Sequence, residues 1–124
     1  MTGPGNVDDV LAAERRRVAR QVADLARDLQ AVIDATADAN ADDEHDPEGS
    51  TIGFERAQVA SLLDRARARL VELDQAGERL RAGTYGDCEV CGGPVGADRL
   101  AAHPTATRCV PCATGTGPAG RLLR

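Results

Sequence analysis

Four cysteines occur as two pairs of the form Cys-x-x-Cys, Cys88 with Cys91 and Cys109 with Cys112, and 17 residues separate the pairs. Each pair can direct two thiolates at one point, and two such turns complete a tetrahedron with Zn–S bonds of about 2.3 Å. Four thiolates fill the coordination sphere and leave no open position for a substrate. The spacing therefore predicts one structural Zn²⁺ ion.

Two disulfides or a redox pair are the alternatives for these cysteines. The segment Met1–Asn6 has no basic cluster followed by an apolar run, so we expect no signal peptide and a cytoplasmic protein, where disulfides are rare. No βαβ pattern surrounds either pair, which disfavours a thioredoxin-like motif. The only histidines are His45, which lies among carboxylates, and His103, which lies between the two cysteine pairs. We expect His103 to be a surface residue, because four cysteines already complete the site.

A second cluster that could do chemistry is acidic. Residues 38–48 contain neither Lys nor Arg and hold six carboxylates, Asp38, Asp42, Asp43, Glu44, Asp46 and Glu48. Such a cluster could bind or compete for Mg²⁺, or pair with Arg and Lys of a partner. The alternative is a solvated loop in which Asp46, Pro47 and Glu48 begin a helix as N-cap, first residue and first-turn acid.

Two amphipathic segments flank the acidic cluster. In the first, from Val7 to about Asn40, apolar residues recur at heptad spacing, at Leu11, Val18, Val22, Leu25, Leu29 and Val32. In the second, from about Thr51 to Ala82, four- and three-residue steps connect Val59, Leu63, Ala66, Leu70, Leu73, Gly77 and Leu80. This period predicts two helices that bury one stripe each.

The two helices are expected to form an antiparallel hairpin. Pro47, Gly49 and Gly53 interrupt the chain between them, and each arm would be about 45 Å long at about 1.5 Å per residue. A homodimeric coiled coil is the alternative, and we expect a monomer. Gly77 weakens the second helix by about 1 kcal/mol relative to Ala, and Gly83 is suited to its C-terminal end.

The sequence thus predicts a mainly α protein with four segments. These are a disordered N-terminus (1–6), a coiled-coil hairpin with an acidic tip at about 40–50 (7–82), a four-cysteine zinc finger (83–113) and a flexible tail (114–124). The chain has 124 residues and is 42% hydrophobic but only 2% aromatic. Because aromatic side chains usually dominate compact cores, a narrow helix–helix seam suits this composition better than a barrel or sandwich.

Charge and motif content exclude several functions. Fifteen basic residues against 20 acidic ones give a formal charge of -5, which argues against general nucleic-acid binding by charge, and we expect no direct sequence-specific DNA binding. Charged residues make up 28% of the chain, and no run of about 20 apolar residues predicts a membrane span. An enzyme is not expected, because there is no nucleophile–base pair, open metal site or phosphate-binding loop.

The cysteine-rich segment resembles the DksA/TraR family of C4-type zinc-finger transcription regulators. The resemblance rests on Gly83-Thr84-Tyr85-Gly86-Asp87-Cys88-Glu89-Val90-Cys91-Gly92-Gly93-Pro94-Val95, Arg99-Leu100, Pro104-Thr105-Ala106 and Cys109-Val110-Pro111-Cys112. Val95 stands where the family more often has Ile. The predicted hairpin fits the same family, so the resemblance covers roughly residues 7–113.

The resemblance implies a function in transcription. Family members bind RNA polymerase, insert the coiled coil through its secondary channel and place acidic tip residues near the catalytic centre. They alter the lifetime of promoter complexes, often together with the alarmone ppGpp, which makes ppGpp a candidate co-effector and links the chain to the stringent response.

The family's tip reads Asp-x-x-Asp-x-Ala, whereas here Asp43 and Asp46 keep the spacing but Glu48 replaces Ala. A register shifted by a few residues is the alternative, and the candidate tip residues are Asp42, Asp43 and Asp46. Two other hypotheses remain from the residues themselves. One is a zinc-stabilised hairpin that binds a different protein, and the other is a thiol-based redox or zinc switch.

Overall fold

A computed structural model describes residues 4–42 and 47–115, with side chains described for 7–37 and 51–115. It contains four helices in the order α1 (Pro4–Asp42), α2 (Pro47–Ala82), α3 (Ala97–Ala102) and α4 (Val110–Ala113). Within the described residues no strand forms, and a single antiparallel bridge joins Asp87 to Pro94. The prediction of a mainly α fold is confirmed.

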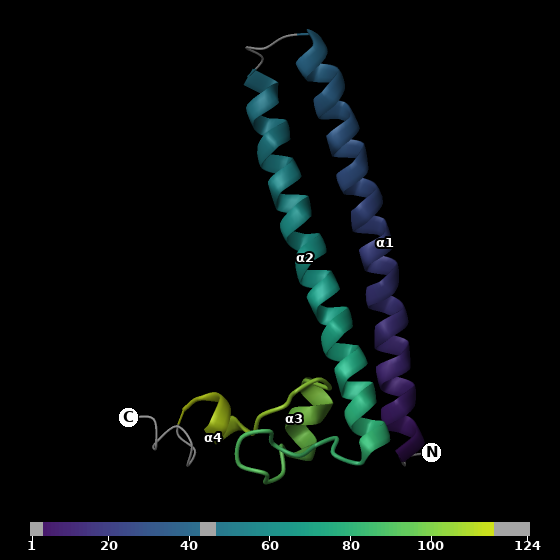
Figure 1. Ribbon diagram of the computed structural model, residues 1–124, viewed down its shortest axis with the longest axis vertical. Coiled ribbons are helices and arrows are strands. Elements are labelled where there is room, and N and C mark those ends of the chain that lie inside the picture. Colours follow the sequence, from purple (N-terminus) through teal and green to yellow (C-terminus); the bar gives the residue numbers. More distant parts are fainter. Residues whose placement is uncertain (1–3, 43–46, 116–124) are drawn as a thin grey trace. The chain divides into compact units, whose positions relative to one another are not determined.

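The chain divides into two compact units. One is residues 13–71, and the other combines the residues up to Ala12 with those from Glu72 onward. Residues 13–71 contain most of α1 and α2, which run antiparallel as the two arms of a hairpin (Figure 1). Among the described residues, none of the helices combines the length and the apolar character needed to span a bilayer.

A narrow seam of small and medium apolar side chains holds the hairpin together. In the unit 13–71, Val18, Leu63 and Ala66 are buried. The other predicted seam residues of this unit are half-buried, namely Val22, Leu25, Leu29, Val32, Val59 and Leu70. The heptad stripes predicted from the sequence therefore form the contact between the helices.

In the second unit the buried helical residues are Leu11, Leu73 and Ala76. The sequence pattern placed Gly77 on this stripe, but Ala76 is fully buried and Gly77 is only half-buried. A step of three residues from Leu73 reaches Ala76, and a step of four reaches Gly77. Both steps are compatible with a helix, so the period alone does not distinguish the two positions.

The helix boundaries differ from those expected. Helix α1 begins at Pro4, inside the segment expected to be disordered. Helix α2 begins at Pro47, as in the alternative that made this proline the first residue of a helix, and not near Thr51. Proline is favoured at the first position of a helix, because the amide it lacks has no intrahelical partner there. Gly49 and Gly53, expected to interrupt the chain, lie within α2.

The C-terminus of α2 forms as predicted. Gly83 follows the helix with a φ of 80°, a left-handed conformation that glycine adopts without steric cost. The Thr84 amide donates to the Arg79 carbonyl at 2.9 Å and the Gly83 amide to the Leu80 carbonyl at 3.3 Å. These two bonds form a Schellman motif, which ends the helix and begins the cysteine-rich segment.

Candidate metal centre

The four cysteine side chains lie together in one cluster. The Sγ atoms of Cys88, Cys91, Cys109 and Cys112 all lie within 4.8 Å of one another, and those of Cys91 and Cys109 are 3.8 Å apart. A tetrahedron with Zn–S bonds of about 2.3 Å has S–S edges of about 3.8 Å. The cluster therefore fits a single zinc ion with four thiolate ligands and no open position.

Backbone hydrogen bonds shape the first cysteine pair. The Cys88 amide donates to the Gly93 carbonyl at 2.7 Å, and the Gly92 amide donates to the Cys88 carbonyl at 2.9 Å. The Gly93 amide also donates to the Cys91 sulfur at 3.4 Å. The chain thus folds back on itself around this pair, which brings both thiols to the same side.

The second pair lies at α4. Cys109 precedes the helix and Cys112 lies within it, and the Ala113 amide donates to the Cys109 carbonyl at 2.9 Å. The two halves of the site are joined by the Glu89 amide, which donates to the Thr107 carbonyl at 2.8 Å. One helical turn therefore places the second pair of thiols opposite the first.

Two arginines connect α3 to both cysteine pairs. Arg99 Nε donates to the carbonyl of Arg108 at 2.8 Å, one residue before Cys109. Arg108 Nε in turn donates to Glu89 Oε1 at 3.1 Å, and Glu89 lies between Cys88 and Cys91 in the sequence. Arg99 is thus a positioning residue for the second pair, since it holds the backbone from which Cys109 projects. The sequence pattern did not reveal this role.

The thiols of the cluster differ in acidity. Backbone amides of Cys91, Cys109 and Val90 that point at the Cys88 sulfur lower its pKa to about 6. Burial, together with hydrogen bonds among the thiols, raises the pKa of Cys112 to about 12. A bound zinc cation would favour the thiolate of both residues, because a coordinating thiol is deprotonated by the metal.

The loop between α3 and the second cysteine pair is attached to the end of α2 and to Tyr85, three residues beyond that end. The Tyr85 hydroxyl donates to the Pro104 carbonyl at 2.8 Å, and Arg79 Nη2 donates to the Thr105 carbonyl at 3.5 Å. Burial of the Tyr85 ring raises the pKa of its hydroxyl, which therefore stays protonated as a donor. The loop is held at one end by these groups and at the other by Cys109.

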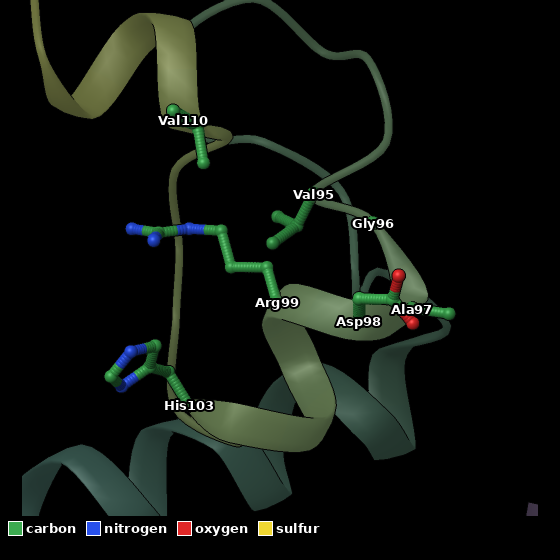
Figure 2. Close-up of a pocket in the computed structure, with 7 residues that line it drawn as sticks. All are labelled: Val95, Gly96, Ala97, Asp98, Arg99, His103 and Val110. Carbon is green, nitrogen blue, oxygen red and sulfur yellow. The ribbon is translucent and has the colours of Figure 1, made fainter.

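Beside this loop a hollow of about 600 Å³ opens between α3 and α4. Figure 2 shows Arg99 and His103 projecting from α3 and its C-terminal end, with Val95 and Val110 nearby. His103 is exposed and lies outside the cysteine cluster, in line with the surface position expected for it.

The structure describes less of the acidic cluster. Asp42 is the last residue of α1, but its side chain is not among those described. Asp43, His45 and Asp46 lie outside the described residues altogether. Their assignment to an active tip therefore stays a prediction.

Comparison with known proteins agrees with this geometry. Residues 83–116 match the family model of the prokaryotic dksA/traR C4-type zinc finger. The RNA polymerase-binding transcription factor DksA from two strains of Caulobacter vibrioides is 45% identical over 56 residues. The matched part is 45% of this chain and 39% of those proteins, so it spans about two fifths of their length.

A solved structure extends the likeness to the whole fold. The structure of transcription factor DksA2 from Pseudomonas aeruginosa matches with a TM-score of 0.76 at 24% identity, covering 95% of this chain and 85% of that one. At this identity the match shows a shared fold. The family match and the clustered thiols together confirm the prediction of one zinc ion.

Proposed function

We propose that this chain, whose residues 83–116 match the zinc finger of the DksA/TraR family, is a transcription regulator that binds RNA polymerase through its secondary channel. The observation that carries the proposal is the 45% identity over 56 residues to proteins named as RNA polymerase-binding transcription factors. The helical hairpin of residues 13–71 supports it, since a slim pair of helices suits insertion into a narrow passage.

The dimensions of the hairpin arms are compatible with such insertion. Helix α1 has 39 residues and α2 has 36, which corresponds to lengths of about 58 and 54 Å. The connection between them carries Asp43 and Asp46, and Asp42 ends α1. In this proposal these three carboxylates act at the tip, where they bind or compete for a divalent cation or pair with basic groups of the polymerase.

The zinc finger has a supporting role in the proposal. Because four thiolates close the coordination sphere, the metal stabilises residues 84–113 and carries out no reaction, and we assign no enzymatic activity to the chain. We further propose that the protein acts in the cytoplasm as a monomer, binds RNA polymerase rather than a specific DNA sequence, and takes ppGpp as a co-effector during initiation.

The test combines binding and transcription. Zinc-loaded protein is expected to co-elute with core RNA polymerase in size-exclusion chromatography and to change the lifetime of promoter complexes in vitro. The variant Asp43→Ala/Asp46→Ala should lose the effect on transcription while still co-eluting. The control Asp28→Ala/Glu55→Ala removes two exposed carboxylates outside the tip and should behave as the wild type.

Three results would contradict parts of the proposal. If the wild-type protein does not co-elute with polymerase, the assignment of RNA polymerase as the partner is wrong. A pull-down that recovers a different protein would favour a general interaction module instead. Equal activity of the tip variant and the control would overturn the role of Asp43 and Asp46.

A further inference from the structure

A band of arginines surrounds the hairpin in the middle of an otherwise acidic protein. Residues 14–20 of α1 and 64–69 of α2 carry seven arginines and only two acids, Glu14 and Asp64. These two segments therefore have a net charge of +5, so the rest of a chain with net charge -5 carries -10. We call this band the arginine collar: Arg15, Arg16, Arg17, Arg20, Arg65, Arg67 and Arg69.

The two segments lie at the same level of the hairpin. Arg69 Nη2 lies 3.6 Å from Glu14 Oε2, which sets the register of the antiparallel helices. Position 20 of α1 then lies opposite position 63 of α2, so all seven arginines fall within about 10 Å along the helix axes. Six of them are exposed, and Arg69 is half-buried beside Glu14.

The charges point in several directions around the hairpin. Successive residues of a helix are rotated by about 100°, so Arg15, Arg16 and Arg17 project from three sides of α1. Glu14 neutralises part of the collar, because Arg17 Nε donates to it at 2.7 Å and this hydrogen bond lowers the pKa of Glu14. The helical rotation therefore spreads the exposed guanidinium groups over several sides of the hairpin and does not gather them on one face.

We propose that the arginine collar is the binding surface for an acidic protein surface that encloses the hairpin, at the mouth of the passage into which it inserts. This inference rests on the proposed function and adds to it the chemistry of the contacted surface. The collar ends at Arg20, 22 residues before the end of α1, and thus about 33 Å from the tip. A surface at that depth contacts the collar while the tip reaches the interior.

The arrangement fits an enclosing protein surface better than nucleic acid. A duplex presents phosphates over a long and continuous path and selects a basic face of matching length. The collar is short, and acids border its two segments in the sequence, at Asp8, Asp9, Asp24, Glu72 and Asp74. These carboxylates would repel the adjoining phosphates, whereas a ring of protein carboxylates matches the short band and pairs well with guanidinium groups.

The test uses the full zinc-loaded chain and core RNA polymerase. The collar variant Arg16→Gln/Arg20→Gln/Arg67→Gln removes three exposed charges and keeps good helix formers. The matched control Arg27→Gln/Arg56→Gln/Arg81→Gln removes three exposed charges elsewhere. At low salt the collar variant should associate with polymerase roughly tenfold more slowly and with weaker salt dependence, while the control stays close to the wild type.

A charge-preserving variant separates charge from fold. Arg16→Lys/Arg20→Lys/Arg67→Lys should restore most of the association rate, and circular dichroism should show equal helicity in all variants. If the wild type binds polymerase and the collar variant associates at the same rate, the role of the collar is wrong and the proposed function stands. Binding of a 30-base-pair DNA duplex that depends on the collar would overturn the assignment to a protein surface, and no polymerase binding by the wild type would overturn the proposed function itself.

Discussion

Gly77 and Gly83 lie six residues apart, and substitution of each by Ala is expected to change stability in opposite directions. At Gly77 the backbone is helical, and an added Cβ would meet only the flexible end of Arg81, whose Nη1 lies 3.7 Å away. Ala exceeds Gly in helix propensity by about 1 kcal/mol. Gly77→Ala should therefore raise the free energy of unfolding by about 1 kcal/mol and the melting temperature by roughly 4 °C.

At Gly83 an added Cβ would meet nothing within 4 Å, so crowding does not contribute. The cost arises from the backbone, because φ is +80° and Ala in the left-handed region is unfavourable by about 1 kcal/mol. Gly83→Ala should therefore lower the free energy of unfolding by about this amount. The two substitutions thus differ in sign although both sites have room for a methyl group.

Urea unfolding followed by circular dichroism at 222 nm, with zinc present throughout, measures both variants against the wild type. The expected result is a higher midpoint for Gly77→Ala and a lower one for Gly83→Ala. A shift of both midpoints in the same direction would refute the reasoning, because it would mean that backbone conformation does not decide the effect at these two sites.

Further predictions follow from burial and from the metal site. Leu63 is 2% exposed and Phe54 is 76% exposed, so Leu63→Ala should cost about 2–4 kcal/mol of stability and Phe54→Ala less than about 0.5 kcal/mol in urea unfolding. The pKa of Glu14 is lowered, so its ionised form stabilises the fold at pH values above the ordinary pKa of 4.5, and this contribution is lost as the pH falls through the lowered pKa. In Glu14→Gln the free energy of unfolding should therefore depend less on pH in this range. Arg99→Met should weaken zinc binding by about tenfold in a chelator competition, because it removes the donor to the Arg108 carbonyl, and Arg99→Lys, which keeps a donor, should weaken it less. Metal analysis should give one zinc per chain, and chelation should expose the amides of 84–113 to hydrogen exchange before those of 51–71.

The hairpin was predictable because its signal repeats along the chain. Six apolar positions in the first segment and seven in the second share one period, so a single irregular residue does not obscure it. The exact buried residue was not predictable where steps of three and four both remain helical, as at Ala76 and Gly77. The helix starts were only partly predictable, because a proline is compatible both with an interruption and with the first residue of a helix; the start at Pro47 was one of two alternatives, and the start at Pro4 was missed.

The zinc site was likewise predictable only in part. The spacing within and between the cysteine pairs is a local constraint and predicted the metal directly. Helices α3 and α4 have six and four residues, which is too short for a recognisable period. The contacts of Arg99 and Tyr85 were missed because their acceptors are backbone carbonyls, which every residue possesses and which no side-chain pattern marks.

These carbonyl contacts explain how so small a module can be ordered. Among the described residues 84–113, only Cys88 and Val95 are buried, so apolar burial contributes little to its stability. Because the chain has one Tyr, one Phe and no Trp, and Phe54 is exposed on α2, Tyr85 is the one aromatic side chain near the site, and it acts through its hydroxyl. The loop after α3 is consequently fixed by the metal at Cys109 and by α2 and its C-terminal extension through Arg79 and Tyr85. Loss of either support leaves the loop with one attachment, so metal binding and packing against α2 should stabilise one another.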